Sequence, residues 1–342
     1  MSELLRIDEP AAPPVPPPQW RAFLEMGFRP LYLAGVGWAL LSVAIWIFTP
    51  AFAHGRLGGM AWHAHEMLWG FVATIAAGFL LTAVTNWTGV NPLKGRPLGA
   101  LCLAWLVARI GFLMTGETAF IVASVAESLF FFGSAAAVAR AIYPKRSKRN
   151  YGVPLLLAAL GLTNLFFLAA IDRGDIALAM SHVQAGMLVM AVVAMLVGRR
   201  VIPFFAMRAV TGLQIPMHTA SGQWQLGAGA LAALCVLLQW TAGAAAALAV
   251  AGAITLWQLF AWQPWAVRGK PLLWILYIGY AALGVGLLVG AAQQLGLVQR
   301  AAWSVHTIGV AGFAVLIIGM VTRTALGHLG RPLATDRSMV AS

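Results

Sequence analysis

Residues 62–85 read WHAHEMLWGFVATIAAGFLLTAVT, and this stretch decides the fold. After Glu66 it contains no charged residue. A helix needs about 20 consecutive apolar residues to cross a hydrocarbon core about 30 Å thick. The stretch therefore predicts a membrane-spanning α-helix.

The composition of the whole chain agrees with this reading. Of the 342 residues, 61% are hydrophobic and 9% are charged, whereas soluble domains carry roughly 25% charged residues. So little polar surface excludes a water-soluble globule. The net charge of +12 does not indicate nucleic-acid binding, because the basic residues form short clusters between apolar runs, which is typical of cytoplasmic loops.

Ten apolar runs of spanning length predict an all-α polytopic transmembrane helix bundle. They are Leu31–Ala53, Trp62–Thr85, Leu98–Met114, Phe120–Tyr143, Val153–Ile171, Ile176–Val197, Trp224–Trp240, Ala242–Trp262, Leu272–Gln293 and Ala301–Val321. The seventh and eighth form either a hairpin or a broken helix. The aromatic and basic residues between Arg199 and Gln223 predict a short interfacial helix. No repeat of fixed period is visible.

Loop charge sets the topology and the domain limits. Only Arg56, Arg173 and Arg300 fall on outer segments if both ends of the chain are cytoplasmic, and nearly all other basic residues fall on inner ones. We therefore expect an N-in, C-in bundle over residues 28–333. Residues 1–27, which include a proline-rich stretch, are expected to be a disordered cytoplasmic tail, and 334–342 a short second tail.

Four histidines are expected in one layer near the outer face, namely His63, His65, His182 and His306. At 1.5 Å per residue, all lie within about 10 Å of the outer ends of their spans. Neutral imidazole is a common ligand of transition metals and of haem, so the layer predicts a metal or haem site. Each histidine can instead form an interhelical hydrogen bond.

Helix geometry and neighbouring residues limit this site. Residues two apart point in nearly opposite directions, so His63 and His65 cannot both face one metal, and the deeper His65 is favoured. Met67, Met180 and Met187 could add soft ligands for copper, but methionine also fills gaps in apolar packing.

Charged residues are also predicted within the outer half of the spans. Arg109 and Glu127, on adjacent spans, are expected to form a buried ion pair, as a structural brace or as part of a substrate or proton path. Glu66 is expected either to orient a neighbouring imidazole or to face headgroup water.

The order of several motifs resembles that of the NnrS family. Phe28-Arg29-Pro30 is followed by WHAHEM at 62–67, by Arg200-Val201-Ile202-Pro203, and by a closing GHLGRPL at 327–333 that includes His328 and Arg331. Arg323 lies just before this last element, and no role is assigned to Arg323, His328 or Arg331. The ordered set covers nearly the whole chain.

The resemblance implies a multi-pass protein of the bacterial inner membrane that contains haem and copper and acts in the nitric oxide response, protecting against nitrosative stress. It implies no firmly assigned reaction, and His63, His65, His182 and His306 would be the ligand pool. Two departures stand out. Family members usually have twelve spans, two more than predicted here, and Tyr277 stands where a histidine is expected.

Two other functions remain open. A transporter of metal or of a small molecule would need a polar path across the membrane, but the inner half of the predicted spans has almost no ionisable residues. A non-catalytic assembly or sensor protein would keep its activity after the outer histidines are replaced. Nitric oxide, or a related small molecule, is the expected partner, together with the lipid bilayer.

Overall fold

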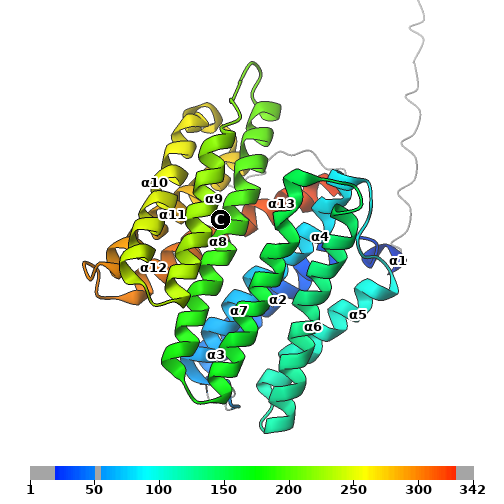
Figure 1. Cartoon of the computed structure of the whole chain (residues 1–342). Helices are drawn as coiled ribbons and strands as arrows, with labels where there is room; N and C mark the ends of the chain where they lie inside the picture. The colour runs from blue at the N-terminus through cyan, green and yellow to red at the C-terminus, as the bar shows by residue number, and fades with distance from the viewer. Residues whose placement is uncertain (1–19, 51–54, 329–342) are drawn as a thin grey trace, which may run out of the picture.

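The computed structural model describes residues 20–50 and 55–328, and every regular element within these ranges is helical. The long helices pack side by side as one bundle (Figure 1). In chain order the α-helices are α1 (Trp20–Phe23), α2 (Phe28–Phe48), α3 (Gly59–His65), α4 (Thr74–Thr88), α5 (Arg96–Leu113), α6 (Glu117–Ile142), α7 (Gly152–Asp172), α8 (Ile176–Ala209), α9 (Thr219–Leu237), α10 (Thr241–Ala261), α11 (Pro271–Gln294), α12 (Ala301–His306) and α13 (Val315–His328).

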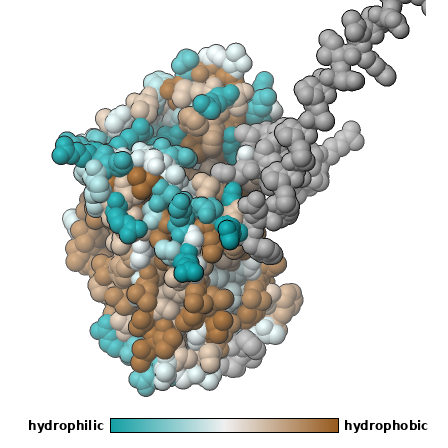
Figure 2. All heavy atoms as spheres, turned by 90° about the vertical axis from the view of Figure 1, so that its right-hand side faces the viewer, coloured by the Kyte–Doolittle hydropathy of each residue, from teal (hydrophilic) through white to brown (hydrophobic). Residues whose placement is uncertain are grey.

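The chain is a polytopic transmembrane helix bundle, as predicted. In the described ranges, nine helical stretches are long and apolar enough to cross a membrane. The seventh predicted span, Trp224–Trp240, corresponds to α9, which begins with polar residues such as Gln223 and Gln225 and falls outside these nine. It nevertheless packs against both α8 and α10. Figure 2 shows a broad band of hydrophobic side chains on one face, with hydrophilic side chains gathered mainly above it.

The connections around α8 and α9 decide two open points. Leu237 ends α9 and Thr241 begins α10, and the two helices pack together, so they form a hairpin. The predicted interfacial helix after Arg199 is wrong, because α8 continues through this segment to Ala209. Its 34 residues extend about 51 Å at 1.5 Å per residue, well beyond the hydrocarbon core.

Residues 20–27, which the sequence predicts as part of a disordered tail, pack against the bundle. The Gly95 amide donates to the Leu24 carbonyl at 2.7 Å, and the Asn91 side chain donates to the Glu25 carbonyl at 2.7 Å. The predicted disordered tail of 1–27 is therefore wrong for residues 20–27. Residues 1–19 and 334–342 lie outside the described part of the chain.

One arrangement, a short α-helix joined by a π-helix to a longer α-helix, occurs twice and was not predicted from the sequence. A π-helix, η2 (Glu66–Ala73), joins α3 to α4, and a second π-helix, η5 (Thr307–Ala314), joins α12 to α13. His65 comes directly before η2 and His306 directly before η5. Pro30 near the start of α2 and Pro271 at the start of α11 are the same number of residues apart as these histidines. The segments α2–α4 and α11–α13 therefore share one pattern.

The two π-helices and α8 meet at the centre of the bundle. Each of η2, η5 and α8 packs against the other two. These three elements carry or directly follow the predicted outer histidines, since His182 lies near the start of α8. The fold therefore gathers the histidine-bearing helices from distant parts of the chain.

Candidate functional site

A fully buried ionic network lies between η2, α5 and α6. His65, Glu66, Arg109 and Glu127 each expose at most 1% of their surface. The Nδ1 atom of His65 lies 2.8 Å from Oε1 of Glu66, and its Nε2 lies 2.9 Å from Oε2 of Glu127. The guanidinium of Arg109 donates to both carboxylates, so Arg109 and Glu127 form the ion pair expected from the sequence.

The charges within this network balance. Both ring nitrogens of His65 face carboxylate oxygens, and the amide nitrogen of Asn164 also lies 3.0 Å from its Nε2. With His65 protonated, so that both nitrogens donate, one imidazolium and one guanidinium oppose two carboxylates with no net charge. Buried ions are tolerated only when they are paired and hydrogen-bonded, and here each ion is paired, with the Nε of Arg109 left as a buried atom without a partner.

Two neutral side chains complete the network and were missed by the sequence reading. The Trp38 indole nitrogen donates to Glu66 at 2.6 Å, and the Asn164 amide donates to Glu127 at 3.2 Å. Asn164 stands alone as an amide within the apolar run of α7, and that isolation was the available signal. Gly70 gives the network room, because a Cβ there would lie 2.6 Å from the Glu66 carboxylate.

His63 and His182 have a different environment from His65. The ring of His63 stacks on Trp46 with 4.9 Å between centroids, and that of His182 lies 5.7 Å from Phe166. The Nδ1 atom of each is buried and has no hydrogen-bond partner. A buried polar atom without a partner costs about 1–3 kcal/mol, so both nitrogens are positioned to accept a ligand.

His306 is exposed, and its Nδ1 lies 2.8 Å from the Ala302 carbonyl. Donation to this oxygen fixes the proton on Nδ1 and leaves the lone pair on Nε2, which is a common arrangement for a ligating histidine. His306 also lies within electrostatic range of His63. Among the described residues, however, no group of three or more His, Cys, Asp or Glu side chains is spaced to hold one metal ion.

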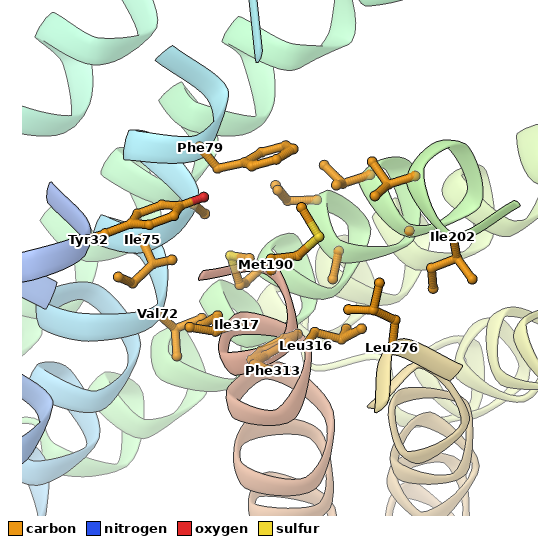
Figure 3. Close-up of a pocket in the computed structure, with 17 residues that line it drawn as sticks. Tyr32, Val72, Ile75, Phe79, Met190, Ile202, Leu276, Phe313, Leu316 and Ile317 are labelled. Atoms are coloured by element: carbon orange, nitrogen blue, oxygen red, sulfur yellow. The ribbon is translucent and has the colours of Figure 1, made fainter. Parts of the chain in front are cut away.

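An apolar cavity of about 90 Å³ lies deeper, where the three central elements meet (Figure 3). Val72, Ile75, Ala76 and Phe79 line one wall, and Phe313, Leu316, Ile317 and Met320 line another. These eight residues pair off at the same sequence spacing as His65 and His306, so the repeated helices present matching faces. Met190 of α8 lies on a third wall.

The remaining predicted positions lie elsewhere. Tyr277 of α11 is buried, and its hydroxyl donates to the Trp262 carbonyl at 2.9 Å. Arg323 of α13 is buried and lines a separate chamber together with Arg200. His328 ends α13, and Arg331 lies outside the described residues.

Comparison with known proteins gives one match. The family model described as NnrS protein matches residues 22–342, which is nearly the whole chain. No curated protein and no solved structure matches it.

Proposed function

Because this chain belongs to the NnrS family, whose members are associated with the nitric oxide response, we propose that it binds haem and copper and helps protect a bacterial cell against nitrosative stress. Its spanning helices make it a membrane protein, and the bacterial inner membrane is the proposed location. The buried, unpartnered Nδ1 atoms of His63 and His182 carry the proposal.

The histidine environments support different roles for the four residues. Haem iron can be held by single histidines from different helices, so a haem site would not need three ligands gathered at one point. We assign His63, His182 and His306 to the ligand pool, because each keeps an unpartnered nitrogen or an exposed ring. His65 is assigned to the ionic network, because metal binding would remove it from two carboxylates.

A copper site here would combine histidine with a second type of donor, or use fewer than three ligands. Met187 of α8 is buried, and its terminal methyl lies 3.8 Å from the position that a Cβ on Gly309 would take. The Met187 side chain therefore lies against η5 at Gly309, three residues after His306. Histidine with methionine is a donor set that suits copper, so His306 and Met187 are the proposed pair.

The central cavity supports nitric oxide as the partner. A neutral diatomic partitions into lipid and into dry apolar cavities, as xenon does in apolar protein cavities. The cavity of about 90 Å³ has almost only apolar lining and lies between α8, which carries His182, and the helices that follow His65 and His306. When bound, haem would supply an iron atom to which nitric oxide coordinates, and the chain would supply the ligands and the apolar surroundings.

The test is the visible spectrum and the metal content of the protein purified in mild detergent. Loss of the Soret band in His63→Ala, His182→Ala or His306→Ala identifies the axial ligands. His218→Ala is the matched control, because His218 packs on Trp257 at 4.9 Å and lines an inner chamber. It should keep full haem content.

Two outcomes would refute the assignment. Folded protein without haem and without copper refutes the cofactor proposal and favours a transporter or an assembly partner. Retained haem in all three alanine variants, with loss in His65→Ala, refutes the division of roles among the histidines.

A further inference from the structure

A second chamber lies at the end of the bundle opposite the ionic network. It has a volume of about 610 Å³ and is lined by Phe28, Asn86, Arg200, Arg323 and Gly327, among others. These residues come from the start of α2, the end of α4, α8 and the end of α13. By the charge pattern of the loops this is the cytoplasmic end. The chamber shares the lining residues Tyr32, Phe79 and Met320 with the central cavity, so the two spaces adjoin.

Arg323 is a buried cation in the lining of this chamber. The residue is 8% exposed, and its Nε is buried without a hydrogen-bond partner. The guanidinium stacks over Phe205 at 4.1 Å and makes a long hydrogen bond of 3.3 Å to the Leu272 carbonyl. These contacts hold the guanidinium in place but do not neutralise it. Among the described residues no carboxylate pairs with this guanidinium, and a buried cation without a counter-ion is costly.

Arg200 adds a second positive charge to the same chamber. It donates to the Asn150 side chain at 2.6 Å and to the Arg149 carbonyl at 2.9 Å, and its Nε is also buried and unpartnered. Both acceptors are neutral. The guanidinium lies over Trp87 at 5.7 Å, so neutral groups and an aromatic ring position it as they position Arg323.

No carboxylate among the described residues compensates these charges. The lining contains no aspartate or glutamate, and neither does the neighbouring basic chamber that shares Trp87, Arg200 and Phe204. The other described acidic residues, apart from Glu25, lie in the ionic network or near the α7–α8 and α5–α6 turns. Glu25 is exposed and does not line the chamber.

We propose that this chamber binds an oxoanion between Arg200 and Arg323, either a free phosphate-like ion or the phosphate of an anionic lipid headgroup. A guanidinium presents a planar fork of donors that matches oxoanion geometry, and stacking on an aromatic ring fixes its orientation. The hydroxyl group of Thr324 and the amide of Asn86 lie in the same lining and can complete the anion's hydrogen bonds. The site does not depend on the outer histidines.

The test measures the thermal stability of the full chain in detergent as phosphate is titrated at constant ionic strength. A ligand that binds only the folded protein raises its melting temperature by an amount that grows with the logarithm of the ligand concentration above Kd. Arg323→Gln and Arg200→Gln should each weaken phosphate binding by roughly ten- to a hundredfold, the contribution of one charge-assisted hydrogen bond. Arg323→Lys should recover only part of the affinity, because it keeps the charge and loses the fork.

Arg208→Gln is the matched control. Arg208 is on α8 like Arg200 and packs over Phe204 at 4.9 Å, but it is exposed and lies outside the chamber. It should bind phosphate as the unchanged protein does. Equal weakening in Arg208→Gln and Arg323→Gln would attribute the effect to general surface charge and overturn the site.

Two further measurements separate the sources and protect against misfolded variants. Mass spectrometry of the detergent complex detects a retained anionic lipid, which Arg323→Gln should lose while Arg208→Gln keeps it. On the unchanged protein, phosphate or bound lipid should protect Arg200 and Arg323 from an arginine-specific dicarbonyl reagent, while Arg208 reacts. Absence of protection, of retained lipid and of phosphate stabilisation together would refute the proposal.

Discussion

Replacing Arg109 with methionine should destabilise the bundle more than any other change of a single charge. Arg109 contacts both carboxylates of the network, and its removal leaves Glu66 and Glu127 opposed by one imidazolium. All of these groups are at most 1% exposed, so water does not screen the excess negative charge. Removing one partner of a buried ion pair costs about 3–5 kcal/mol, and we expect a loss within that range.

The second half of the experiment restores charge balance. In Arg109→Met with Glu127→Gln, His65 and Glu66 remain as one buried pair without net charge. The cost of the double variant should therefore be less than the sum of the single costs, by about 2 kcal/mol. The assay is reversible unfolding of the detergent-solubilised protein in sodium dodecyl sulfate, followed by far-ultraviolet circular dichroism.

Arg56→Met provides the matched control. Arg56 pairs with Asp172, and the two side chains are 38% and 50% exposed, so its loss should cost no more than about 1 kcal/mol. If Arg109→Met costs no more than Arg56→Met, the network does not brace the fold. If the double variant is additive, the charges act independently and the balance argument fails.

Three other changes test packing. Gly279→Ala should destabilise the protein by about 1–3 kcal/mol in the same unfolding assay, because the new Cβ would lie 3.0 Å from the Leu316 amide of α13. Gly133→Ala is the control and should be neutral, because the nearest neighbour of its new Cβ is a flexible leucine methyl at 3.4 Å. Ala76→Leu should fill the central cavity and abolish xenon binding measured by xenon-129 nuclear magnetic resonance, and persistent xenon binding would place the gas elsewhere. Tyr280→Phe should cost about 1 kcal/mol in thermal stability by removing hydrogen bonds of 2.8 and 2.9 Å to Gln225 and Gln258, and no change would mean that water replaces them.

Most of the spanning helices could be predicted from the sequence, because the length of an apolar run indicates a span. The ion pair of Arg109 and Glu127 followed from depth alone. The direction in which a side chain points did not. The π-helix that begins at Glu66 changes the rotation of the chain directly after His65, and nothing in the residue types announces it.

The contributions of Trp38 and Asn164 depended on tertiary packing. An indole and an amide in apolar runs can face lipid, a neighbouring helix or a polar group, and only the assembled bundle places them beside Glu66 and Glu127. The central cavity was hidden for a similar reason. It requires η2, η5 and α8 to meet at a particular register, and pairwise helix contacts cannot be read from one sequence.

The repeated arrangement of helices places a histidine directly before each π-helix, and the two histidines have different surroundings. His65 is followed by Glu66 and is enclosed by carboxylates, whereas His306 is followed by Thr307 and stays exposed with its Nε2 outside the helix hydrogen bond. A change of one neighbouring residue accompanies the difference between a locked and an open imidazole. If Glu66 is replaced by threonine and Thr307 by glutamate, the environments of His65 and His306 can be compared within a single polypeptide.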